Sequence, residues 1–110
     1  MKLPNASNAF VDLAKLRDYS LSETHEEGKN KARVFWSALE IDASDAEWLR
    51  DHLLAAVLQA ECKTGRVSVY GRRYSVDFLL RKGSLSAMVR RDWMVRGGEN
   101  FPRLTSCYVL

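Results

Sequence analysis

The spacing of apolar side chains divides the chain into two parts that meet near Cys62. Before this residue, apolar positions recur every three to four residues, which is the period of an amphipathic helix. This period predicts a short helix over residues 13–20 and a second helix that starts near Gly28 or Lys29. The apolar stripe expected for the second helix comprises Ala32, Phe35, Trp36 and Leu39.

A third helix is expected from Ser44 to about Glu61. Ser44 and Glu47 have the spacing of a capping box, in which the serine oxygen accepts from the backbone N–H three residues later and the glutamate reaches back. The apolar stripe that follows comprises Leu49, Leu53, Val57 and Ala60.

After Cys62 apolar and polar residues alternate, which is the period of a strand with one buried face. The alternation predicts strands over residues 66–70, 73–80, 85–96 and 103–109, with turns at Gly71 and at residues 81–84 and 97–100. One face of the third strand comprises Leu85, Ala87, Val89, Arg91, Trp93 and Val95. In the last strand, alternation places Arg103, Thr105 and Cys107 on one face.

The order of these elements predicts the fold class. Short connections between successive strands favour an antiparallel meander. Helices followed by strands are typical of an α+β fold, here with N-terminal helices packed on one face of a C-terminal four-stranded antiparallel β-sheet. With 110 residues, the chain is expected to form a single domain, residues 1–110.

Composition indicates a soluble, folded protein. Hydrophobic residues make up 46% of the chain and aromatic residues 10%, which excludes a disordered protein. No apolar run approaches the roughly 18 residues of a membrane helix, and no apolar segment of a secretory signal follows Lys2. The two cysteines, Cys62 and Cys107, lack the spacing of a zinc site. We therefore expect reduced thiols and a cytoplasmic location.

Charge is distributed unevenly between the two parts. The formal net charge is +3, but residues 1–61 carry seven Lys/Arg and eleven Asp/Glu, whereas residues 62–110 carry ten Lys/Arg and three Asp/Glu. Eight of those ten are arginine, whose planar donor fork suits phosphate. The basic part could bind a polyanion, or it could instead complement the acidic helical part of the same molecule.

His25 and Lys31 are the first candidates for chemistry. His25 lies in a polar loop before the second helix, and its imidazole could act as a general acid or base. Lys31, one helical turn further on, could stabilise the charge of a phosphate, although such a pair also arises by chance. The acidic residues of this loop are read as solvated charge, so no metal is expected. No nucleotide-binding glycine motif is present, so no cofactor is expected.

The last strands hold a second candidate group. Arg103 and Thr105 lie two residues apart, and an arginine beside a hydroxyl can clamp a phosphate. On the adjacent strand Arg91 and Trp93 share a face, where the indole could stack on a base. The alternative is that Thr105 is an ordinary strand residue and that Trp93 belongs to the core.

Four segments carry a family resemblance: residues 25–35 (HxxGxxKARVF), 46–49 (AEWL), 70–74 (YGRRY) and 102–106 (PRLTS). They resemble an uncharacterised family of bacterial domains of about this length. The layout is similar to that of the barnase/EndoU/colicin/RelE-like ribonuclease toxins, in which helices precede a four-stranded sheet. That resemblance implies His25, Lys31, Arg103 and Thr105 as catalytic residues, by analogy of fold. The second catalytic histidine of EndoU-like members has no counterpart here.

The leading functional hypothesis is a toxin-like, metal-independent endoribonuclease. His25 would act on the ribose 2′-hydroxyl, Lys31 and Arg103 would hold the phosphate, and Thr105 would orient it. The expected RNA contacts are Lys29, Arg33, Arg91 and Trp93. The expected partners are RNA and a cognate antitoxin or immunity protein, with no membrane.

Two alternatives remain open at this point. The first is a non-catalytic interaction module that binds nucleic acid or an acidic protein through the basic sheet part. The second is a structural domain that self-associates through an open sheet edge or through the side of the third strand that carries Met88 and Met94.

Overall fold

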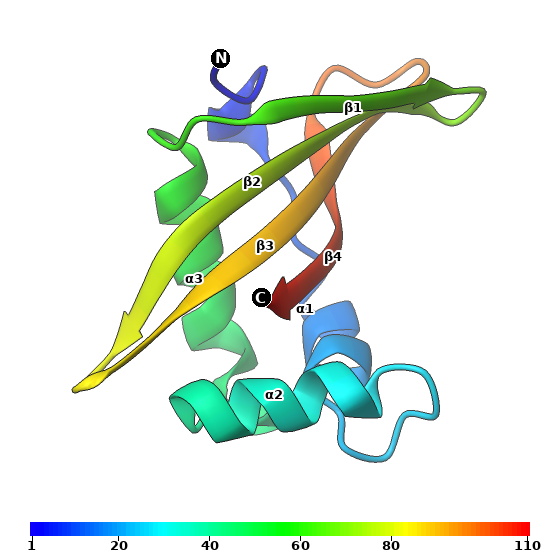
Figure 1. Ribbon diagram of the computed structural model, residues 1–110. Coiled ribbons are helices and arrows are strands. Elements are labelled where there is room, and N and C mark those ends of the chain that lie inside the picture. Colours follow the sequence, from blue (N-terminus) through cyan, green and yellow to red (C-terminus); the bar gives the residue numbers. More distant parts are fainter.

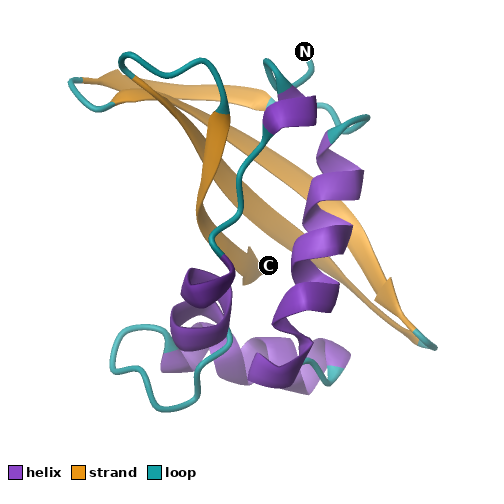
Figure 2. Ribbon diagram, turned by 180° about the vertical axis from the view of Figure 1, so that it is seen from behind, coloured by secondary structure: helices purple, strands orange, loops and turns teal.

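In the computed structural model, which describes residues 1–110, three helices lie on one face of a twisted four-stranded sheet (Figures 1 and 2). The helices are α1 (Leu13–Lys15), α2 (Lys29–Leu39) and α3 (Ala46–Val57). A π-helical segment, Leu16–Ser20, continues α1 and is called the π turn below, and short 3-10 turns span Ala6–Asn8 and Ala43–Asp45. None of the helices has the length and apolar character needed to cross a bilayer.

The sheet consists of β1 (Lys63–Ser68), β2 (Gly71–Lys82), β3 (Leu85–Arg96) and β4 (Pro102–Val109). The strands follow one another in the order β1-β2-β3-β4, and each neighbouring pair is antiparallel. The N-terminal segment lies along β4, because Phe10 donates to the carbonyl of Pro102 and accepts from Leu104. The predicted α+β fold and the meander are confirmed.

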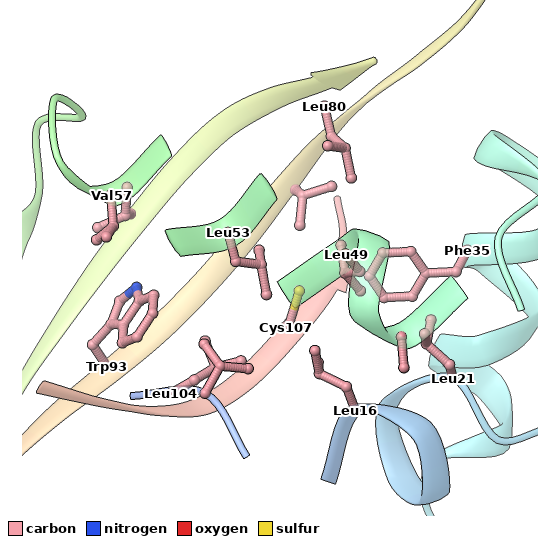
Figure 3. Close-up of a cluster of buried hydrophobic side chains, with 14 of the residues drawn as sticks. Leu16, Leu21, Phe35, Leu49, Leu53, Val57, Leu80, Trp93, Leu104 and Cys107 are labelled. Carbon is pink, nitrogen blue, oxygen red and sulfur yellow. The ribbon is translucent and has the colours of Figure 1, made fainter. Parts of the chain in front are cut away.

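The core lies between the helices and the sheet and joins the two parts of the chain. It contains 19 buried side chains, among them Phe35, Leu49 and Leu53 from the helices and Trp93 and Cys107 from the sheet (Figure 3). All five are at most 1% exposed. The 3.6-residue period before Cys62 and the two-residue period after it therefore describe two sides of one core.

Both ends of the predicted third helix differ from the structure. The capping box before α3 uses Asp42 and Asp45, whereas Ser44 donates its hydroxyl to Asp42. α3 ends at Val57 and not near Glu61, because the N-terminal segment pairs with the chain there: Lys2 forms a β-bridge with Glu61. Backbone pairing with this segment takes the place of further helical turns.

The alternation predicted for β4 fails at a β-bulge. Asp92 of β3 pairs with Ser106 and Trp93 pairs with Leu104, so Thr105 has no partner of its own. The extra residue moves every later side chain of β4 to the opposite face. Cys107 is consequently buried under the helices and does not share a face with Arg103 and Thr105, contrary to the prediction.

Candidate functional site

His25 and Lys31 lie together around the ring of Tyr19. The His25 ring packs edge-on against Tyr19 with 4.6 Å between ring centroids. Lys31 Nζ lies 5.9 Å from the centroid of Tyr19 and 5.1 Å from that of Tyr108, near the end of β4. A lysine ammonium at these distances is attracted by the electron-rich ring faces. The π turn, the loop before α2, α2 itself and β4 thus contribute to one cluster.

Tyr108 connects this cluster to the solvent-facing side of the sheet. It is the cross-strand partner of Arg90, and Arg90 in turn pairs with Asp77 of β2. The guanidinium donates to both carboxylate oxygens of Asp77, at 2.8 and 2.9 Å. Asp77, and to a smaller extent Tyr108, raise the pKa of Arg90, while Arg90 lowers the pKa of Asp77. Such a bidentate pair fixes the orientation of the guanidinium.

We call these five side chains the polar row: Tyr19, Lys31, Tyr108, Arg90 and Asp77. The row contains two cations next to Tyr108: Lys31 lies over the Tyr108 ring, and Arg90 is the cross-strand partner of Tyr108. Both cations are only partly buried and remain accessible from solvent. An arrangement of two cations around an aromatic ring can hold a phosphate and stack a neighbouring base.

His25 also has a structural role at the start of α2. Its Nδ1 accepts hydrogen bonds from the backbone N–H groups of Glu27 and Gly28, both at 3.1 Å. Because Nδ1 is an acceptor, the proton of the neutral ring belongs on Nε2. In this arrangement Nε2 is a hydrogen-bond donor, which suits the binding of an anion better than the removal of a proton.

Arg103 and Thr105 are held in other interactions. Arg103 forms a bidentate ion pair with Glu99, at 2.9 and 2.7 Å, which raises the pKa of Arg103 and lowers that of Glu99. Its guanidinium also lies near the rings of Phe10 and Phe101. The hydroxyl of Thr105 donates to the carbonyl of Asp92 at the bulge (3.0 Å).

These two residues do not join the polar row. Arg103 precedes Tyr108 by five residues along β4, which corresponds to roughly 15 Å in an extended strand. The guanidinium of Arg103 is paired with Glu99 and makes no contact with Lys31 or Tyr108 in the structure. The structure therefore separates the four predicted catalytic residues into two pairs: His25 and Lys31 both lie beside the Tyr19 ring, whereas Arg103 and Thr105 lie in the first half of β4.

The prediction that Arg91 and Trp93 contact RNA is wrong, because both side chains are 0% exposed. They do share a face, as alternation predicts, but it is the face beneath the helices. Arg91 donates from Nη1 to the carbonyl of Leu53 (3.0 Å), and its guanidinium lies 3.9 Å from the centroid of Phe78. Lys29 and Arg33, by contrast, lie on α2 two residues before and two residues after Lys31, which places them on another face of the helix than Lys31, and Arg33 is exposed.

Sequence reasoning missed Tyr19, Tyr108 and Arg90. A partial signal exists, since the predicted meander makes β3 and β4 neighbours and Arg90 occupies the polar face of β3. The register that places Tyr108 opposite Arg90 depends on the bulge at Thr105, which alternation alone does not reveal. No group of three or more His, Cys, Asp or Glu side chains is placed to hold a metal ion.

A family model matches residues 2–110 of the chain. The chain belongs to this family, which is described as Domain of unknown function (DUF6883). The predicted resemblance to an uncharacterised family over nearly the whole chain is thereby confirmed. No curated protein matches the chain.

A solved structure shares the fold. A chain from the "Contact-dependent growth inhibition toxin - immunity protein complex from Klebsiella pneumoniae 342" superposes with a TM-score of 0.69. The match covers 91% of this chain and 98% of that chain, with 15% sequence identity. At this identity the likeness is one of fold.

Gly28 allows the backbone before α2 to lie directly against Tyr19, and its replacement should move Tyr19 away from His25. A Cβ at this position would overlap the backbone carbonyl of Tyr19. We expect Gly28→Ala to lower the free energy of unfolding by about 2 kcal/mol, because the π turn must move away from α2. Urea unfolding measures the loss, and the chemical shifts of the His25 ring report its separation from Tyr19.

Gly97→Ala is the matched control for this substitution. No heavy atom lies within 4 Å of a Cβ built at Gly97, so the same chemical change should alter stability by less than about 0.5 kcal/mol. If the two variants were equally stable, the close contact between Gly28 and Tyr19 would not be what holds the cluster together.

Proposed function

We propose that this protein is a toxin-like domain that cleaves RNA without a metal ion, and that the polar row is its active site. The observation that carries the proposal is that two partly exposed cations neighbour Tyr108: Lys31 lies over its ring, and Arg90 is its cross-strand partner. The fold shared with a chain of a toxin–immunity complex supports a role in such a system. The site requires no cofactor, and its action on RNA would take place in the cytoplasm.

In this proposal the protein positions the phosphate and stabilises charge. A phosphodiester beside Tyr108 would contact Lys31 Nζ and the guanidinium of Arg90, which Asp77 holds in place. Both cations would stabilise the extra negative charge that develops on the phosphoryl oxygens as the 2′-oxygen attacks. The Nε2–H of His25 is the donor available for a further phosphate oxygen or for the leaving group.

RNA itself supplies the nucleophile. The 2′-oxygen forms a bond to phosphorus, the bond from phosphorus to the 5′-oxygen breaks, and the products are a 2′,3′-cyclic phosphate and a 5′-hydroxyl. The 2′-hydroxyl gives its proton to solvent water, and the 5′-oxygen takes a proton from solvent, so the step releases no net proton. Holding this internal nucleophile in line with the leaving group is itself a large contribution to rate. Lys29 and Arg33, on another face of α2 than Lys31, would bind phosphates further along the RNA.

The product and the metal requirement test this function directly. Incubation of the protein with total RNA or transfer RNA in EDTA should give fragments that end in a 2′,3′-cyclic phosphate. A substrate with a 2′-deoxy nucleotide at the cleaved position should remain intact, because it has no internal nucleophile. Absence of cleavage, a need for a divalent metal, or fragments with a free 3′-hydroxyl would each contradict the proposal.

A non-catalytic interaction module is the second candidate. It is favoured by the arginines at the turn between β1 and β2, which have no carboxylate partners in the structure. Binding to a polyanion or to an acidic protein without turnover, weakened by salt, would support this function in place of catalysis.

A further inference from the structure

The turn between β1 and β2 carries exposed apolar side chains. Val67, Val69 and Tyr70 are 59%, 93% and 73% exposed. Alternation predicted that Val67 and Val69 continue a strand, but β1 ends at Ser68 and Val69 belongs to the turn. The turn lies far from α2 and α3, beside the loop between β3 and β4 (Figures 1 and 2). Such a concentration of apolar side chains at a projecting turn is characteristic of an interaction surface.

Unpaired positive charge surrounds these side chains. Arg66, Arg72, Arg73 and Arg96 are exposed, and none of them belongs to an ion pair. The segment from Lys63 to Val76 contains no acidic residue. The nearest acidic residues along β2 and beyond β3, Asp77 and Glu99, are already held by Arg90 and Arg103. None of these four arginines therefore has an ion-pair partner within the chain, although Arg96 acts on Glu99 at longer range.

The turn has a defined shape. Tyr70 accepts a hydrogen bond from the backbone N–H of Gly97 (3.2 Å), which ties the turn to the neighbouring loop. Gly71 follows with φ of 143°, and a Cβ at this position would overlap the carbonyl oxygen of Val95. A hollow of about 300 Å³ lies beside the turn, lined by Arg66, Ser68, Tyr70 and Arg73. A surface that is already ordered loses little entropy on binding.

We propose that this surface, the hairpin tip formed by Arg66–Arg73 and Arg96, docks an acidic protein. Carboxylates of the partner would pair with the arginines, and an apolar recess of the partner would accept Val69 and Tyr70. Such an arrangement joins apolar anchors to complementary charge, as in specific protein interfaces.

The apolar side chains favour a protein over RNA as the occupant. Arginine and tyrosine suit phosphates and bases, but Val67 and Val69 offer nothing to a phosphate and cannot stack as an aromatic ring does. Burying them requires apolar atoms on the partner. Addition of a strand to β1 is disfavoured, because Lys63, Arg66 and the bulge between Thr64 and Val67 are features that block edge pairing. The proposed contact between the hairpin tip and its partner is therefore made by side chains and not by backbone pairing.

The hairpin tip is separate from the polar row. Arg73, the residue of the tip nearest to the polar row on β2, is four residues from Asp77, which corresponds to roughly 13 Å. A partner bound at the tip leaves Lys31 and Tyr108 free, so this inference does not depend on the proposed ribonuclease activity.

A displayed library of random peptides, with acidic and basic residues in equal proportion, tests the partner chemistry. Selection on the full-length protein should enrich net acidic peptides that contain aliphatic or aromatic residues. A synthetic copy of an enriched peptide, followed by fluorescence anisotropy, should bind less tightly as salt is raised. Its affinity should fall at least tenfold, about the size of an interface hot spot, for Val69→Asp combined with Tyr70→Ser.

Val34→Asp is the matched control. Val34 is an exposed valine on α2, and its replacement should leave peptide affinity within roughly twofold of the wild type. No enrichment, enrichment of neutral or basic peptides, or equal affinity for the tip variant would overturn the proposal. A single-stranded RNA that binds more tightly than any peptide, and that loses affinity in the same tip variant, would overturn it in favour of nucleic acid.

Discussion

Replacement of Lys31 by methionine should lower the rate of RNA cleavage by about 100-fold, the usual effect of removing one group that stabilises transition-state charge. Methionine retains the length of the side chain and the helix propensity of α2, but it removes the ammonium beside Tyr108. Single-turnover cleavage with protein in excess over substrate measures the rate of the chemical step. Substrate affinity, measured separately, should change much less, because other cations also bind the RNA.

Lys15→Met provides the control for this prediction. Lys15 is an exposed lysine of α1 and lines a shallow depression with Arg96, Arg103 and Thr105. The Lys15→Met variant should cleave RNA at the wild-type rate if the polar row is the active site. Loss of activity in Lys15→Met with full activity in Lys31→Met would instead assign the reaction to the depression around Arg103.

Replacement of Arg91 by methionine should stabilise the protein by about 2 kcal/mol. Burial lowers the pKa of Arg91 to about 10, a shift that corresponds to a cost of about 3 kcal/mol for keeping the charge at neutral pH. No carboxylate pairs with it, and its Nε and Nη2 atoms have no hydrogen-bond partner. The contacts with Leu53 and Phe78 offset about 1 kcal/mol of this cost. Methionine fills a similar space without the charge.

Urea unfolding at neutral pH measures this gain, with Arg81→Met as the control. Arg81 is exposed on β2, so the same substitution there should change stability by less than about 0.5 kcal/mol. Because the folded protein releases the Arg91 proton at lower pH than the unfolded chain does, the cost is complete below about pH 10 and declines above it. The difference in the free energy of unfolding between wild type and Arg91→Met should therefore become smaller above about pH 10. A less stable Arg91→Met variant would mean that the two contacts outweigh the cost of burial.

The fold could be predicted because two periods of apolar residues dominate the chain. Phe35, Leu49 and Leu53 follow the helical period, and Val89 and Trp93 follow the strand period, and all five are buried. Those patterns hold over ten or more residues, so one irregular position does not hide them. Element ends were less predictable. α3 stops early because of a contact with the N-terminal segment, which no local pattern indicates.

The candidate site was less predictable, for physical reasons that differ between residues. Arg91 follows the apolar period of β3, and its charge alone suggested a ligand site, whereas the structure buries it. His25 was expected as an acid or base, but hydrogen bonds to Nδ1 from its own loop decide which nitrogen is available. Tyr19 and Tyr108 gain their place beside Lys31 through tertiary packing between segments distant in sequence. Spacing along the chain carries none of this information.

The bulge at Thr105 also affects how relatives of this chain are compared. Before it, Pro102 and Leu104 face the helices; after it, Cys107 and Val109 do, so inward positions change from even to odd residue numbers. A relative without the bulge has one residue fewer in this strand. An ungapped alignment to such a relative would match Tyr108 to a core position. A gap placed at Thr105 restores the correspondence, and the search for equivalents of Tyr108 should begin from that gap.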